Sequence, residues 1–164
     1  MPENIEGLEQ LLRTLGDVPV KLERNVLRGS LRAGAKVQLL AGRESAPVEE
    51  GGEHPGALRK SGRIVTSSRG GVVKASVKFG DKVAFYARMV ATGTKAHVIR
   101  AKGAHSLFFG GRLVESVQHP GAKANNWLKG VLDGTSSAAV AAVAEYMRKR
   151  MTKEGIKTPG PEGN

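Results

Sequence analysis

The chain has 164 residues, with 26 Lys and Arg against 15 Asp and Glu, a formal net charge of +11, and no cysteine. This length fits one domain with one hydrophobic core. The lack of cysteine excludes a disulfide framework, a thiolate metal site and a cysteine nucleophile, and fits folding in a reducing cytoplasm. The first residues lack the pattern of a signal peptide, and no apolar run approaches the roughly 18 residues of a membrane span. We therefore expect no membrane partner, and the positive charge favours contact with phosphate or with acidic protein surfaces.

Two helices are predicted on the N-terminal side. Apolar residues recur at helical spacing as far as Leu15, which predicts a short amphipathic helix that ends near Gly16. Asp17 and Pro19 then suit the start of a new helix, as its cap and first-turn residue. The apolar stripe continues beyond them, so we predict one long helix over residues 19–42.

The middle of the chain is predicted to be a loop followed by strands. Residues 43–56 are rich in Glu, Gly and Pro, which indicates a mobile loop. A strand is expected over residues 62–68, with a hairpin turn at the next glycine pair. Residues 73–79 alternate apolar and polar side chains, which is typical of a half-buried antiparallel strand. Further short strands are expected over residues 98–100, 107–109 and 113–117, while residues 83–89 fit a helix or a strand equally well.

The C-terminal side is predicted to be helical again. Residues 125–132 suggest a short helical segment, and Thr135 or Ser136 suits the cap of a final helix. Gly155 is expected to end that helix, and residues 156–164 to form a disordered tail.

Helices and strands are therefore grouped rather than alternating, which predicts an α+β fold. We expect a long N-terminal helix packed on an antiparallel β-sheet that forms a meander, with a C-terminal helix. Residues 1–155 are predicted to form a single domain of this kind.

The residues that most often carry chemistry form no recognisable site. His97, His105 and His119 have no metal-ligand spacing, and no carboxylate lies near them in the sequence. Ser61, His97 and Asp81 are the residue types of a hydrolytic triad, but no nucleophile-elbow pattern accompanies them. The glycine pairs fit neither a P-loop nor a dinucleotide fingerprint. We therefore expect a non-enzymatic protein without catalytic, cofactor-binding or metal residues.

The densest basic run lies near the predicted end of the last helix. It comprises Arg148, Lys149, Arg150 and Lys153, and it is the sequence's candidate surface for DNA or an acidic partner. Cations at a helix C-terminus also interact favourably with the helix dipole, which is the simpler explanation.

Three motifs occur in order after the long predicted helix. They read G-x-L-x-x-S, then Y-A-x-x-V-x-x-G-T, then H-P-G-x-K-A with an aromatic residue three positions later. The residues that carry them are Gly56, Leu58 and Ser61; Tyr86, Ala87, Val90, Gly93 and Thr94; and His119, Pro120, Gly121, Lys123, Ala124 and Trp127.

Over roughly residues 5–150, this order resembles the tail-completion or head–tail joining proteins of lambda-like phages and related prophages, the family of minor tail protein Z. The chain departs from the family at three positions. Ala91 stands where the family usually has Glu, which puts any ion pair there in doubt. Trp127 replaces the commoner Phe, and Pro55 directly precedes the first motif, where a Thr or Ser is usual.

The resemblance implies a structural virion protein of the phage neck, made in the host bacterial cytoplasm. Such a subunit would join other neck and tail proteins (connector or stopper, tail terminator or tail tube) at the connector–tail junction, around the DNA channel. It implies a homo-oligomer, with a six-fold ring favoured, and non-specific contact with DNA in the channel.

The motif residues themselves suggest structural roles. Gly93 and Gly121 are expected in tight turns or at positive φ, and Pro120 to fix the backbone beside one of them. Tyr86 and Trp127 are expected to be core anchors with polar tips that need partners. Two alternatives stay open: a basic nucleic-acid-binding module, and a small hydrolase that uses Ser61 or a histidine.

Overall fold

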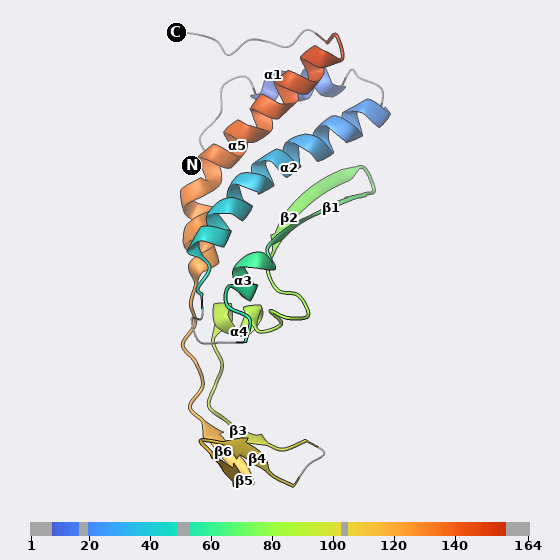
Figure 1. The fold of residues 1–164 in the computed structure, drawn as a ribbon. Coiled ribbons are helices and arrows are strands. Elements are labelled where there is room, and N and C mark those ends of the chain that lie inside the picture. The colour runs from blue at the N-terminus through green and yellow to red at the C-terminus, as the bar shows by residue number, and fades with distance from the viewer. Residues whose placement is uncertain (1–7, 17–19, 49–52, 103–104, 157–164) are drawn as a thin grey trace. The chain divides into compact units, whose positions relative to one another are not determined.

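The computed structural model describes residues 8–16, 20–48, 53–102 and 105–156, and these form an α+β fold, as predicted (Figure 1). The chain divides into two compact units. We call Met1–Ala84 together with Trp127–Asn164 the helical unit, and Phe85–Asn126 the hairpin unit. The single domain over residues 1–155 and the mobility of the 43–56 loop stay predictions. The predicted tail, apart from Ile156, lies outside the described residues.

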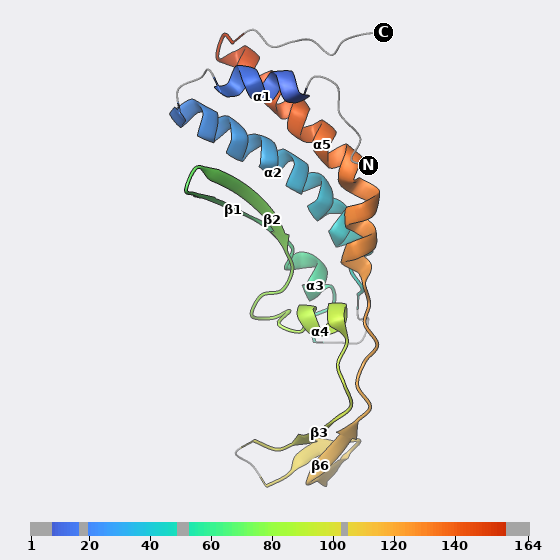
Figure 2. The same cartoon turned by 180° about the vertical axis from the view of Figure 1, so that it is seen from behind.

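The helical unit is built in layers. The helix α2 lies between α5 on one side and the β1–β2 hairpin on the other, and α1 packs on α5 (Figures 1 and 2). The expectation that the long helix packs across a face of β structure is therefore confirmed. The elements are α1 (Leu8–Gly16), α2 (Val20–Ser45), α3 (Ala57–Lys60), β1 (Arg63–Arg69), β2 (Val72–Lys78) and α5 (Trp127–Lys153).

The main core of the helical unit lies where α1, α2 and α5 meet. Leucines of α1 pack against Val26 of α2 and against the methionines of α5, and each of these side chains is almost fully buried. Farther along the two long helices, Gly34 lies close to Val143 and to the backbone of Ala139. The missing side chain lets the helices approach closely. The core residues are Leu11, Leu15, Val26, Ala144, Met147 and Met151.

Two helix boundaries differ from the prediction. The helix α2 runs to Ser45, so the predicted loop starts three residues too early. The predicted short segment and final helix are one continuous helix, α5. Neither Thr135 nor Ser136 is an N-cap, because their hydroxyls donate to the carbonyls of Val131 and Asp133 within the helix. The predicted stop at Gly155 is confirmed, with φ of 76° just beyond the last turn.

The β1–β2 hairpin lies where the sequence predicts two strands joined by a glycine turn. The strands are antiparallel, with Arg63 opposite Lys78 and Arg69 opposite Val72, and Gly70 and Gly71 form the turn at positive φ. Along both strands exposed residues alternate with half-buried ones, because only one face packs on α2. The period-2 pattern in the sequence therefore has the cause that we inferred.

The hairpin unit contains α4 and four short strands. The strand β3 pairs with β6, and β4 pairs with β5 between them. The expected continuous meander is therefore wrong in detail, because the described strands form three separate two-stranded sheets. The predicted strand over 113–117 is also divided, at Glu115. The elements are α4 (Ala87–Thr92), β3 (His97–Arg100), β4 (Leu107–Phe109), β5 (Arg112–Val114) and β6 (Ser116–His119).

Candidate assembly surfaces

The first motif fastens α3 to the end of β2. Gly56 precedes the helix with φ of 72°, and Leu58 is 2% exposed. The Ser61 hydroxyl donates to the carbonyl of Leu58 (2.7 Å) and accepts a bond from the N–H of Gly80 (2.8 Å). The motif is therefore a structural clip that joins a helix to a strand end.

Two residues of the suggested triad have structural roles. The Ser61 side chain is buried, and its hydroxyl is engaged in the two bonds of the clip. One carboxylate oxygen of Asp81 accepts bonds from the N–H groups of Val83 (2.9 Å) and Ala84 (2.8 Å). This arrangement turns the chain after β2. The hydrogen bonds explain both residue types without catalysis.

The second and third motifs meet at the base of the hairpin unit. Thr94 and Ala122 exchange two backbone hydrogen bonds, of 2.9 and 3.0 Å. On either side, Gly93 has φ of 72° and Gly121 has φ of 86°. A Cβ on Gly93 would lie 2.6 Å from the carbonyl oxygen of Ala122, and one on Gly121 would lie 2.3 Å from that of Thr94. Only glycine fits at both positions, so the prediction of positive φ is confirmed.

Other motif residues lie beside this bridge. The backbone N–H of Asn125 donates to the carbonyl of Val90 (3.0 Å), which brings the two ends of the unit together. His119 Nδ1 accepts a bond from the N–H of Gly121 (3.0 Å). Ala87 is buried, whereas Tyr86 is only half-buried. The prediction of a core anchor is therefore only partly met at this tyrosine.

Trp127 anchors the first turn of α5 in the helical unit. It is 9% exposed, and its ring meets that of Phe79 edge-on, with 4.7 Å between centroids. Gly42 of α2 lies beside both rings. The predicted packing role is confirmed. The indole N–H, however, has no hydrogen-bond partner among the described residues.

The three histidines considered as metal ligands do not form a ligand set. His97 and His119 lie opposite each other on β3 and β6, with 5.0 Å between ring centroids. His105 instead lines a cavity beside Glu115. In the part of the chain that the structure describes, no three His, Asp or Glu residues are grouped for a metal ion.

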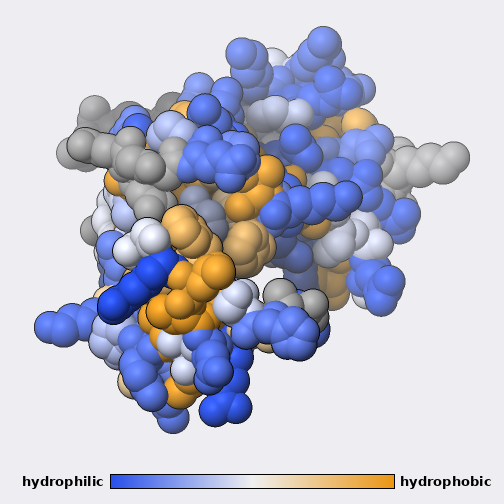
Figure 3. Space-filling model, turned by 60° about the horizontal axis from the view of Figure 1, so that its bottom comes forward, coloured by the Kyte–Doolittle hydropathy of each residue, from blue (hydrophilic) through white to orange (hydrophobic). Residues whose placement is uncertain are grey.

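The hairpin unit exposes a large apolar surface. Phe108 is 75% exposed, Leu113 opposite it in the β4–β5 pair is 70% exposed, and Phe109 is 60% exposed. In Figure 3, which turns these hairpins toward the viewer, apolar side chains lie open at the surface. Both phenylalanines also line a cavity of about 200 Å³ together with β3 and β6 residues, including His119, and with Pro120 just after β6. A protein rarely exposes aromatic side chains in this density unless another surface covers them.

The predicted basic cluster is partly neutralised. Arg150 forms an ion pair with Glu154 (2.7 Å), and Arg148 is half-buried. Of the four residues, Lys149 and Lys153 are thus the exposed cations.

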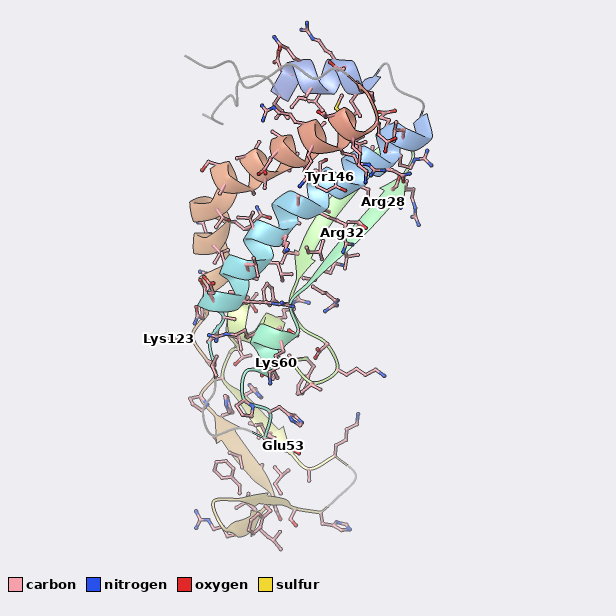
Figure 4. The ribbon with its side chains drawn as sticks, turned by 45° about the horizontal axis from the view of Figure 1, so that its top comes forward. Arg28, Arg32, Glu53, Lys60, Lys123 and Tyr146 are labelled. Atoms are coloured by element: carbon pink, nitrogen blue, oxygen red, sulfur yellow. The ribbon has the colours of Figure 1, made fainter. Side chains whose placement is uncertain are left out.

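A second basic surface was missed in the sequence. Arg24, Arg28, Arg32 and Lys36 follow one another at intervals of four along α2, and all four are exposed. Arg28 and Arg32 can be seen on neighbouring turns in Figure 4. The four-residue interval was the available signal, but it stands out only once the segment is known to be a helix with that side uncovered.

A cavity lined by charged residues of the helical unit lies beside α3. It has a volume of about 360 Å³ and is lined by acidic Glu53 and Asp81 and by basic Lys60, together with His54, Pro55, Ala57 and Val83. Figure 4 labels Glu53 and Lys60. Because both signs of charge line it, its electrostatics favour no particular class of ligand.

Comparison with protein-family models, with curated proteins and with solved structures gives no match to this chain. Among the described residues, no helix has both the length and the apolar character needed to cross a membrane.

Proposed function

We propose that this protein is a structural virion subunit of the phage neck, a tail-completion or head–tail joining protein that acts by assembly. It oligomerises, with a six-fold ring favoured, at the connector–tail junction around the DNA channel. The observation that carries the assembly role is the exposed aromatic surface of the hairpin unit.

The hairpin unit has little core of its own. Among its described residues only Ala87 is buried, while every residue of β3 is exposed. Isolated two-stranded sheets are marginally stable in water, and three strands or packing against another element are usually needed. Two-stranded sheets also leave unpaired backbone groups on both outer edges, which are ready to accept another strand. The physical chemistry therefore favours a unit that is completed by a partner chain.

The placement of the motifs supports the neck family over another kind of assembly protein. The second and third motifs form the bridge from which the hairpins extend. The first motif and Trp127 lie in the helical unit, in the chain segments before and after the hairpin unit. The residues that carry the resemblance thus lie at the base of the hairpin unit and in the segments of the helical unit that flank it in the sequence.

The assembly role is tested by breaking the apolar surface. We expect wild-type protein to form closed oligomers in sedimentation velocity and native mass spectrometry. Phe108→Asp with Leu113→Asp places two charges at facing positions of β4 and β5, so this variant is expected to be monomeric with unchanged helical circular dichroism. The matched control is Val65→Asp with Val72→Asp, which alters exposed apolar residues of the other hairpin and should leave assembly intact. An unchanged oligomer in the first variant contradicts the proposed surface.

The neck role is tested in the phage. Removing the gene should give filled heads and tails that are not joined, or tails that are not completed, in electron micrographs of lysates. The double variant of Phe108 and Leu113 should reproduce this defect. Normal, joined and infectious particles without the protein would rule out the neck function.

A further inference from the structure

The α2 row of cations is not explained by the stability of the helix. Arg24, Arg28, Arg32 and Lys36 lie at the i, i+4 spacing, at which like charges repel and destabilise a helix. No acidic residue occurs from Arg24 to Arg43, so nothing along this stretch offsets the repulsion. The row therefore concentrates positive charge, and hence positive electrostatic potential, along one side of α2.

The outer face of the β1–β2 hairpin carries a second row. Alternation along the strands places Arg63, Arg69, Lys74 and Lys78 on the face turned away from α2, and all four are exposed. Arg63 and Lys78 are direct cross-strand partners, an arrangement that destabilises a sheet. Arg63 donates to the carbonyls of Ser61 and Gly80, which are neutral, so it keeps its full charge. The sequence from His54 to Gly80 also contains no acidic residue.

The two rows come near each other at the tip of the hairpin. Arg24 lines a small cavity with Gly71 and Val73 at the tip of the hairpin, so the α2 row begins where the hairpin row ends. Glu23 also lines this cavity. Among the described residues, no carboxylate forms an ion pair with any cation of either row. Tyr146 rests on Gly29 beside the α2 row and adds a hydroxyl group there (Figure 4).

We propose that these two rows form a binding face for the phosphate backbone of double-stranded DNA. Successive cations of the α2 row lie about 6 Å apart along the helix axis, and the row spans about 18 Å. Phosphates of one DNA strand repeat every ~3.4 Å along the duplex axis, so each step of the row covers about two of them. Five of the eight residues are arginines, whose planar guanidinium groups bind phosphate through two hydrogen bonds.

The chemistry of the face favours duplex DNA over other polyanions. Single strands are held by stacking on aromatic rings, but every member of the two rows is a cation. An acidic protein partner would normally bring an apolar anchor into such an interface, whereas the apolar surface of this chain lies in the hairpin unit. The binding face uses the helical unit alone, so it does not depend on the assembly proposal.

The test measures binding of the full-length protein to a fluorescent DNA duplex as a function of salt. For the wild type, log K should fall linearly with log salt concentration, with one phosphate contact contributing about 0.9 to the slope. Arg28→Gln with Arg32→Gln should reduce that slope by about two and weaken binding to any duplex sequence. Lys74→Gln with Lys78→Gln removes two cations of the hairpin row, so it should lower the slope and weaken duplex binding in the same way.

The matched control is Lys149→Gln with Lys153→Gln, which removes the same charge from the exposed part of the C-terminal cluster. The proposal expects its slope to equal that of the wild type. Equal losses in all variants would mean that net charge alone drives binding, and this would overturn the assigned face. Absence of duplex binding, or tighter binding to polyglutamate or to phosphatidylglycerol vesicles, would overturn it as well. The Phe108 and Leu113 variant should still bind duplex through each monomer, which separates failure of this proposal from failure of the assembly proposal.

Discussion

The helical unit and the hairpin unit differ in how far their apolar side chains are buried. In the helical unit, Leu, Val, Ala and Met side chains of three helices bury one another almost completely. In the hairpin unit, short two-stranded sheets expose phenylalanine and leucine side chains. Burial of apolar area is the main favourable term in folding. The comparison indicates that the helical unit contains a buried apolar core, whereas the described residues of the hairpin unit bury little apolar area.

The two units should differ most in the free energy of unfolding that is lost when an aromatic side chain in each is replaced by alanine. Trp127→Ala removes a buried ring that packs edge-on with Phe79, so we expect a loss of about 3–5 kcal/mol in the free energy of unfolding. Phe108→Ala removes a ring that is 75% exposed and should change it by no more than about 0.5 kcal/mol. Urea denaturation followed by circular dichroism measures both values, since Trp127 is the only tryptophan and fluorescence is lost with it. Equal losses would break the distinction between the units.

A smaller change in stability is expected from a substitution at the point where the two long helices, α2 and α5, approach each other. A Cβ on Gly34 would lie 2.7 Å from a methyl group of Val143 and 2.8 Å from the carbonyl oxygen of Ala139. The backbone atom cannot move aside cheaply, so Gly34→Ala should destabilise the protein by about 1–3 kcal/mol. Gly130→Ala, in α5, meets open space and should instead stabilise it by about 0.5–1 kcal/mol. Thermal denaturation of both variants checks the pair, and two shifts of the same sign would count against the close approach.

The smallest effect on global stability should come from the base of the hairpin unit. Gly121→Ala forces a side chain into a φ of 86° and against the carbonyl oxygen of Thr94. We expect the amides of Thr94 and Ala122 to lose protection in hydrogen exchange, because their two bonds form the bridge. The unfolding free energy of the helical unit should change by no more than about 0.5 kcal/mol. A cooperative loss of protection in α2 and α5 would show that the units unfold together.

Patterns in neighbouring residues predicted the helices, strands and turns that these residues themselves determine. The period of apolar residues gave the long helix, because one side of α2 packs on α5 and another on the hairpin. The glycine pair 70–71 gave the hairpin turn, because both residues need positive φ. Among the motif residues, Gly93 and Gly121 were correctly expected at positive φ, and Trp127 was correctly expected to be packed in the core.

The features that were missed depend on distant residues. The first turns of α5 contain Gly130 and Gly134, which are poor helix formers, yet burial of Trp127 and Val131 on one face outweighs their propensity. The pairing of β3 with β6 joins segments separated by another hairpin, and no local pattern specifies it. The α2 row of cations looked dispersed along the sequence, because a linear run such as 148–150 is more conspicuous than residues brought together by the turn of a helix.

The hydrogen bond between Asn125 and Val90 has a consequence for how this protein can change over evolution. It ties together the two ends of the hairpin unit next to the Thr94–Ala122 bridge, so the strands beyond that bridge can lengthen, shorten or be replaced while the helical unit keeps its fold. An insertion with neighbouring ends behaves as an exchangeable module. Lineages that meet different partners can then diversify β4 and β5 while they inherit the same helical unit.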